Sequence, residues 1–528
     1  MSKKYLMRRY DLVGGMDQAT NPYLMNDSTH VYLKNVIHGE KGTLSKDGGY
    51  SQFLDNMPAS SVDLLFDYQN HTYLSTLSTE EGEIVTTEDG DTLPIGVPNL
   101  LFAISDGDLY KETDSGWELV EADVTTSGQL CNAVNYLDRV YFAEADSVVT
   151  YTDGENVTTL QSDNGDLVKG KYLETLNNTL YLGNITHKFG PNYVLYTQPG
   201  SHVFFNPNEE DYDAYETTSH KIQIDGVITA LKAYQGLMLI FTKNDLWYFN
   251  PDTFEVKQLA ETGCVCHHSI REIDGILYWA SKEGVYRFAG NNMPSIISLP
   301  ITNKVVSSIW SNISSPNFGQ MAAGVLGGKY YLWVGTLTAP LPGDSEPLKN
   351  VVVVYDTYRD VWAFYDNHPV KQWMEILNDE GTPELLFADR KPARVLIRDK
   401  SYNHDGQAID MKIRTKYYDF DRPESEKTLE DLFVAYRPES TESYVNVGIS
   451  VNGTNDYQNY VSDSSNTKLP LEAEQSLEYQ FRRVSLNGTR ARTVSYEIGN
   501  NDNATCVTLL GFTQEFSYML PNLNYSTE

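Results

Sequence analysis

The chain has 528 residues, of which 41% are hydrophobic and 21% are charged, and it contains 37 Tyr, 19 Phe and 7 Trp. This composition excludes a wholly disordered chain and favours a globular protein rich in strand-forming aromatic residues. Asp and Glu number 72 against 40 Lys and Arg, a formal charge of −32, which argues against gripping DNA through a broad basic surface. The charge is compatible with a surface that DNA slides past, but it also simply keeps a large protein soluble.

Residues 1–50 are short apolar pieces separated by turn residues, and they predict an arm that lies against a larger body. The segment lacks the apolar core that a signal peptide needs. The longest apolar runs in the chain, such as 237–241, have only strand length, so we expect no membrane span and synthesis in a cytoplasm. Reduced thiols are expected, because the cysteines are too few and scattered for a disulfide framework. They are Cys131, Cys264, Cys266 and Cys506.

Residues 51–405 carry a strand rhythm that predicts a β-propeller. Residues 62–68 and 71–74 predict one hairpin, and 101–104 with 108–110 predict another around Asp106-Gly107. Two segments, 231–249 and 271–288, repeat the same order of polar turn, aromatic-aliphatic run, second turn and short aromatic strand. The step from Gly236 to Gly275 is 39 residues, the spacing of a four-stranded blade.

Further units of this kind bring the expected number of blades to about six or seven. Helical periodicity is weak throughout, with room for one short helix at 300–313, and 200–220 has the composition of an insertion between strands. The further units are 136–152, 176–197, 325–365 and 385–397.

Residues 406–528 change rhythm and predict a β-sandwich-like domain. About six alternating strands are expected in roughly one hundred residues, which is the density of a sandwich. They are 411–420, 432–436, 444–451, 481–486, 493–498 and 506–516.

One cluster has metal-like composition. If residues 264–268 form a strand, Cys264, Cys266 and His268 share one face and offer three ligands. No second Cys or His pair follows at zinc-finger spacing, so the favoured interpretation is two small buried thiols in a blade strand beside a turn histidine.

Acidic turns are frequent, at 88–91, 106–108, 163–166 and 378–381. Two carboxylates in a funnel could cleave a glycoside, but Asp or Asn with Gly is also what hairpins require. The arginines at 482, 483, 490 and 492 predict either a solvated strand face that pairs with acidic neighbours or a contact with another subunit or DNA. Because motifs for nucleotide, zinc-protease and serine-hydrolase chemistry are missing, we assign no catalytic, cofactor-binding or metal-binding residue.

The start of the chain resembles the head of the tail nozzle and packaged-DNA stabilisation proteins of short-tailed bacteriophages. The similarity continues in the C-terminal runs 415–420 and 432–436. At the start it rests on Gly14-Gly15-Met16-Asp17, Asn21-Pro22-Tyr23, Leu33-Lys34-Asn35-Val36, Gly42-Thr43-Leu44-Ser45-Lys46 and Gly48-Gly49-Tyr50.

This resemblance implies a structural virion protein without catalytic residues or cofactors. It implies a ring, expected to be a hexamer, below the portal and adaptor, around the channel through which double-stranded DNA leaves without sequence-specific binding. Tail fibres or spikes are further implied partners, and the phage tail is the implied location. The alternative hypothesis is a glycan-binding or glycoside-cleaving propeller, suggested by the aromatic content and the acidic turns.

Overall fold

The computed structural model describes residues 3–39, 42–54, 57, 60–68, 75–76, 94–96, 100–113, 115–144, 147–162, 167–186, 189–202, 221–290, 306–378, 380–398, 401–437, 443–460, 469–470 and 479–519. Regular structure in these ranges is almost entirely β, which confirms the expected class. The helices described are α2 (Ser307–Ser311), which lies within the predicted helical segment, α3 (Ser315–Phe318) and the 3-10 helix η2 (His267–Ser269). Among the described helices, none has the length and apolar character that a membrane crossing requires.

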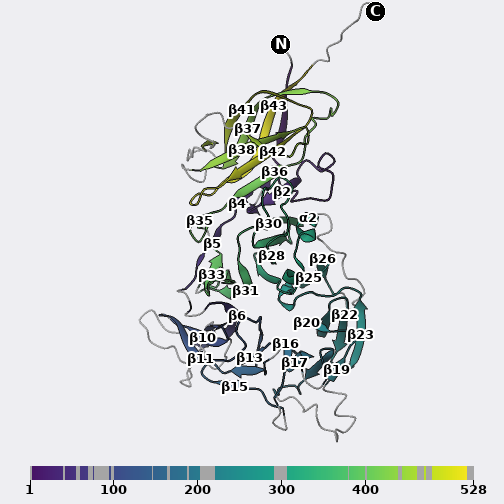
Figure 1. Cartoon of the computed structure of the whole chain (residues 1–528), viewed down its shortest axis with the longest axis vertical. Coiled ribbons are helices and arrows are strands. Elements are labelled where there is room, and N and C mark those ends of the chain that lie inside the picture. Colours follow the sequence, from purple (N-terminus) through teal and green to yellow (C-terminus); the bar gives the residue numbers. More distant parts are fainter. Residues whose placement is uncertain are drawn as a thin grey trace, which may run out of the picture.

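Four antiparallel sheets of four strands follow one another along the first half of the chain (Figure 1). The short strands β7 (Ser75–Thr76) and β8 (Pro94–Gly96), which lie between β6 and β9 in the sequence, pair with each other in a separate sheet. Sheet 1 holds β6 (Val62–Tyr68), β9 (Leu100–Ser105), β10 (Asp108–Thr113) and β11 (Gly116–Glu121); sheet 2 holds β12 (Asn132–Tyr136), β13 (Arg139–Ala143), β14 (Thr150–Thr152) and β15 (Val157–Thr159); sheet 3 holds β16 (Gly170–Leu176), β17 (Thr179–Ile185), β18 (Tyr193–Tyr196) and β19 (Lys221–Gln223); sheet 4 holds β20 (Ile228–Tyr234), β21 (Leu237–Thr242), β22 (Leu246–Asn250) and β23 (Glu255–Ala260).

Three further sheets complete this part of the molecule. Sheet 5 holds β24 (Arg271–Ile273), β25 (Ile276–Ser281) and β26 (Gly284–Phe288); sheet 6 begins with β27 (Ala322–Leu326), β28 (Lys329–Gly335), β29 (Val351–Asp356) and β30 (Val361–Tyr365); sheet 7 holds β31 (Val370–Leu377), β32 (Pro383–Asp389), β33 (Val395–Arg398), β5 (Gly49–Gln52), β34 (Asn403–His404) and β35 (Gln407–Ala408).

The tandem repeat seen in the sequence corresponds to sheets 4 and 5. Its two hairpins turn at Gln235-Gly236 and Asp274-Gly275, where all four residues have positive φ, as a tight type I′ turn demands. The predicted hairpin at Asp106-Gly107 is also confirmed, by β9 and β10. The structure pairs β6 with β9, a partner that the sequence did not predict, and the hairpin of 62–68 with 71–74 stays a prediction. Residues 71–74 themselves lie outside the described ranges.

Each pair of neighbouring sheets shares a buried apolar cluster. Phe66 and Phe102 of sheet 1, for example, pack with Phe142 of sheet 2. Equivalent clusters join sheets 2 and 3, 3 and 4, 4 and 5, 5 and 6, and 6 and 7. Sheet 7 then packs against sheet 1, with Leu386 and Val62 in one cluster and β31 in contact with β6. The sheets therefore form a closed, propeller-like ring.

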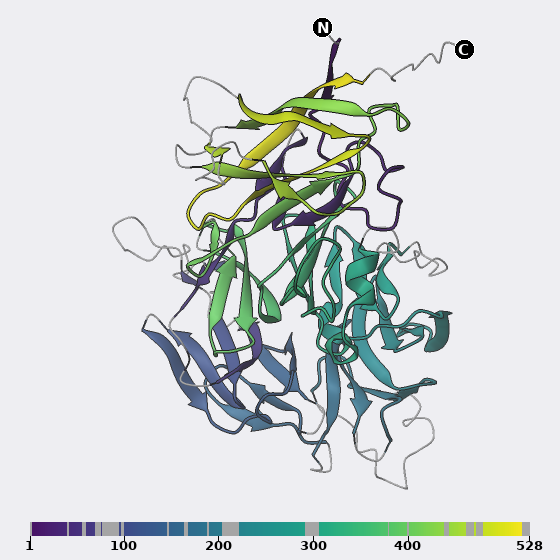
Figure 2. The same cartoon turned by 45° about the horizontal axis from the view of Figure 1, so that its top comes forward.

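Above the ring in Figure 1, two sheets pack face to face around the largest core cluster (Figures 1 and 2). The outer sheet holds β1 (Lys4–Arg9), β3 (Val36–His38), β4 (Leu44–Lys46), β43 (Thr508–Tyr518), β37 (Lys427–Arg437) and β41 (Gln480–Ala491). The inner one continues sheet 6 through β2 (His30–Lys34), β36 (Met411–Thr415), β42 (Val494–Asn500), β38 (Tyr444–Val451), β39 (Gln458–Asn459) and β40 (Leu469–Pro470).

The first fifty residues supply strands to both parts of the molecule. β1 pairs with β43 in the outer sheet, and β2 lies between β30 of the ring and β36. β5 then pairs with β33 of sheet 7. The segment predicted as an arm is thus hydrogen-bonded into the sheets, and apolar residues from both faces of β2, such as Tyr32 and Leu33, are buried.

Candidate interface and ligand sites

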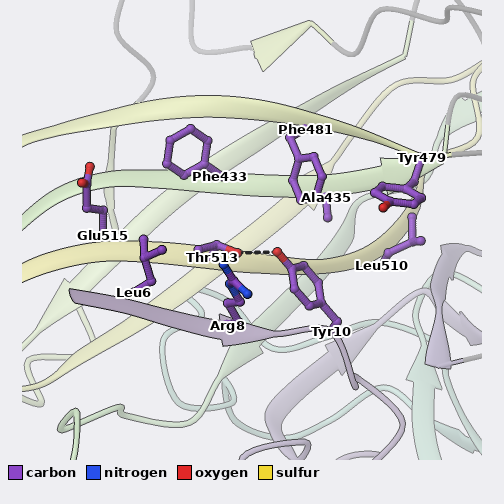
Figure 3. A pocket seen from close by; sticks show the side chains of 10 residues that line it. All are labelled: Leu6, Arg8, Tyr10, Phe433, Ala435, Tyr479, Phe481, Leu510, Thr513 and Glu515. Atoms are coloured by element: carbon purple, nitrogen blue, oxygen red, sulfur yellow. Dashed lines mark hydrogen bonds between the residues drawn. The ribbon is translucent and has the colours of Figure 1, made fainter. Parts of the chain in front are cut away.

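The outer sheet presents an apolar hollow to its surroundings (Figure 3). Inward side chains of its strands, such as Leu432 and Phe512, are buried in the core, and alternation sends their neighbours outward. A solvated sheet face normally carries polar residues, whereas this one carries mainly apolar ones. They enclose a hollow of about 850 Å³. We call this the outer sheet face, lined by Leu6, Arg8, Tyr10, Phe433, Ala435, Tyr479, Phe481, Leu510, Thr513 and Glu515.

Several large side chains of the outer sheet face are strongly exposed. Leu6 is 54%, Tyr479 51% and Phe481 47% exposed. Phe481 lies edge-on to Tyr10, with ring centroids 6.3 Å apart, and the Tyr10 hydroxyl is 2.5 Å from Thr513 Oγ1 (Figure 3). Exposed apolar patches of this kind mark protein interaction sites.

The predicted arginine cluster lies on or beside β41, the strand that contributes Phe481. Arg483 bonds Asp431 of β37 at 2.8 Å while its side chain stays 65% exposed. Pairing with an acidic neighbour is therefore confirmed for Arg483. A contact of this cluster with another subunit or DNA stays a prediction.

A second hollow, of about 670 Å³, lies at the mouth of the ring. Its walls are the segments that lead into or begin β6, β12, β16, β27, β29 and β31, together with the loop that follows β32. Four cationic side chains line it: Lys171, Lys371, Arg390 and Lys391. This concentration of positive charge contrasts with the acidic chain as a whole.

One buried group has the composition of a metal site. The candidate ligand atoms of Asp47, His368 and His404 lie within 4.8 Å of one another. Arg398 already supplies a cation there: its guanidinium donates to Asp47 Oδ1 at 2.5 Å and to His368 Nε2 at 3.0 Å. Nδ1 of His368 in turn donates to Asp366 O at 2.8 Å, which leaves Nε2 as the acceptor. The group is therefore an ion pair of Asp47 with Arg398, and the guanidinium occupies the Nε2 lone pair through which a neutral His368 would bind a metal ion.

Burial sets the titration of this group. It lowers the pKa of His368 well below the usual value, and it lowers the pKa of His404 to about 4. Burial alone would also lower the pKa of Arg398, but Asp47 together with Tyr331 and Tyr365 outweighs this effect and raises the pKa. Both histidines are neutral at pH 7, and Arg398 remains charged.

Cys264, Cys266 and His268 do not share a strand face, because the segment is a loop that ends in η2. The expectation of a strand here is wrong. Cys264 Sγ donates to Cys266 O, and burial raises the pKa of the two thiols to about 12 and about 11. Burial lowers the pKa of His268 to about 4. Protonated, buried thiols pack as small apolar groups.

The acidic turn 106–108 has a structural role. Asp106 accepts hydrogen bonds from Ser60 and Ser61, and Asp108 accepts one from Asp123 N. Burial would raise the pKa of Asp106, but the hydrogen bonds from Ser60 and Ser61 outweigh it and hold the pKa below its usual value. Such a carboxylate does not suit a general acid. Turns 88–91 and 163–166 lie outside the described residues, as does position 379 of the fourth.

Sequence reasoning missed the outer sheet face and the basic ring mouth. Outward apolar positions such as Phe433 and Leu510 were visible in the strands, but their direction depends on register. The cations at the mouth come from residues up to 220 positions apart, from Lys171 to Lys391, and their meeting depends on closure of the ring.

No protein-family model matches the chain, and no curated protein matches it. Among solved structures, the designed Ika8 protein is 13% identical, with 66% of this chain and 100% of that one covered and a TM-score of 0.35. The extracellular domain of a hybrid two-component system from B. thetaiotaomicron is 10% identical, with 88% and 67% covered and a TM-score of 0.40. BamB from Moraxella catarrhalis is 10% identical, with 64% and 100% covered and a TM-score of 0.33. TM-scores this low carry no argument about fold or function.

Proposed function

We propose that this chain is a structural protein of a phage tail, of the nozzle or packaged-DNA stabilisation class. Copies of it form an oligomeric ring around the channel through which DNA leaves, with six copies as the resemblance implies. This oligomeric ring is distinct from the propeller-like ring of sheets within each chain. The ring sits below the portal and adaptor proteins, with fibres or spikes as further partners. The protein is made in the host cytoplasm, ends in the virion tail, and is not an enzyme.

The outer sheet face is the observation that carries this proposal. The segment that bears the resemblance also supplies Leu6, Arg8 and Tyr10 to that face. An exposed apolar sheet face is what an assembling protein presents to its neighbour. We assign a second copy as the occupant, because the resemblance implies a ring of identical subunits and the exposed face carries mainly apolar side chains.

The remaining features agree with a scaffold. We infer that sheets 1–7 are the seven blades of a propeller. The polar groups that looked chemical in the sequence, such as Asp106 and Cys264, serve turns and packing. Duplex DNA would be repelled by an acidic channel wall and so pass without sticking.

Imaging and light scattering test the proposal on the full-length chain, alone and mixed with the adaptor proteins of the infecting phage. We expect rings for the natural protein and monomers for Phe481→Asp, because the charge would have to be desolvated in the contact. The matched control is Leu119→Asp, since Leu119 is 51% exposed on the edge strand β11. It should assemble normally. Monomers in every mixture, or unimpaired rings of Phe481→Asp, would refute the proposal.

A further inference from the structure

Three of the four cations at the mouth of the ring pair with no acid among the described residues. Of the four cations that line it, Lys371 is neutralised by Asp63, with Nζ 2.5 Å from Oδ1. Among the described residues, no carboxylate side chain pairs with Lys171, Arg390 or Lys391. Three uncompensated positive charges therefore face one hollow in a strongly acidic protein.

Arg390 is held in place before any ligand arrives. Its guanidinium lies 3.5 Å from the ring centre of Trp333 and donates to Val370 O and to both oxygens of Gln320. These acceptors are all neutral. Burial lowers the pKa of Arg390 to about 10, which still leaves it charged at pH 7. A guanidinium has five N–H donors, so those not used by these three bonds remain for a ligand.

The cations come from separate parts of the ring and converge. Lys171 belongs to β16 of sheet 3, whereas Arg390 and Lys391 follow β32 of sheet 7. Gathering like charges in a partly enclosed space is unfavourable unless an anion offsets it. A monocarboxylate brings one negative charge, whereas a phosphate group brings about two and three acceptor oxygens.

We propose that the mouth of the ring is a binding site for a phosphate group. Arg390 acts as a fixed, fork-shaped donor, and the flexible Lys171 and Lys391 close on the anion as point charges. The hollow of about 670 Å³ has room for a small phosphorylated compound. The acidity of the rest of the chain favours such small anions over polyanions, although a DNA backbone offers the same chemistry.

Calorimetry with the full-length protein tests the site, using inorganic pyrophosphate in a low-salt buffer without other multivalent anions. We expect saturable binding with Kd of about 1 mM or tighter, weakened by added NaCl. The variant Lys171→Gln/Lys391→Gln should bind at least about tenfold more weakly, since it removes two of the three free charges. Lys243→Gln/Lys257→Gln, at exposed positions of sheet 4, is the matched control and should bind like the natural chain.

A short DNA duplex forms the second arm. Duplex binding that disappears with Lys171→Gln/Lys391→Gln would assign the phosphate to DNA, whereas pyrophosphate binding alone would assign it to a free compound. Absence of binding in both arms, or equal weakening in the control variant, would overturn the proposal. The substituted lysines lie outside the ring's core, so the folded state of the variants can be verified by thermal unfolding. The readout concerns a single chain and does not depend on ring assembly.

Discussion

The ion pair of Asp47 with Arg398 ties the head of the chain to sheet 7, and its loss should be costly. The two side chains are 0% and 6% exposed, and their atoms are 2.5 Å apart. Among the described residues, Asp47→Ala leaves the buried guanidinium with His368 Nε2 as an acceptor and two tyrosine rings beside it. Breaking a buried pair by removing one partner costs about 3–5 kcal/mol. With an unfolding entropy of about 2 cal/mol/K per residue, this predicts a Tm lower by about 3–5 °C.

Differential scanning calorimetry at neutral pH measures this shift. The matched control is Asp405→Ala, which breaks a partly exposed pair with Arg394 in the same region, where Asp405 is 36% exposed. That variant should lose at most about 1 kcal/mol. Replacing both partners, as Asp47→Leu with Arg398→Met, should recover most of the loss. Equal Tm values for Asp47→Ala and Asp405→Ala would refute the assignment of a buried, stabilising pair.

Three further outcomes are expected. Burial lowers the pKa of His30 and of His404 to about 4, so that between pH 6.5 and pH 4 these histidines take up protons in the unfolded chain but not in the folded one. Their contribution to stability is therefore complete above pH 6.5 and falls by about 1.4 kcal/mol per histidine and pH unit down to pH 4. The Tm measured as a function of pH checks this. Gly49→Ala should cost more than about 1 kcal/mol in denaturant unfolding, because Gly49 has φ +88° and an added Cβ would meet the backbone of β34. Thiol labelling at pH 8 should modify the partly exposed Cys506 first and the buried Cys264 only on unfolding, and fast labelling of Cys264 would contradict its burial.

Local patterns in the sequence were sufficient for the class of fold and for most strands. The Asp274-Gly275 turn and the aromatic run after it predict β24 to β26, because turn geometry and strand alternation are properties of neighbouring residues. The pairing of β6 with β9 could not be predicted, since the residues between them separate two strands that meet only in the folded sheet. The strand expected at Cys264 failed for a related reason: packing of η2 against β27 overrides the local β preference.

The sites depend still more on long-range order. Tyr10 meets Phe481 across 471 positions of sequence, and Arg398 meets Asp47 across 351. No local signal distinguishes an outward Phe433 from an inward one, because a shift of one residue in register exchanges the two faces of a strand. The proposed function was therefore accessible from the sequence only through resemblance, and the surfaces offered in its support only through the fold.

The head segment links the two features that matter most for the proposed role. Its β1 forms the edge of the outer sheet face with Leu6, and its β5 lies in sheet 7, beside the buried pair of Asp47 with Arg398. Ordering a segment of this length costs about 1–2 kcal/mol per residue, which scattered contacts on either part alone would not offset. Docking of the head therefore requires that ring and outer sheet are both folded. We therefore expect the complete apolar face to exist only on a finished subunit, which would limit association of partly folded chains.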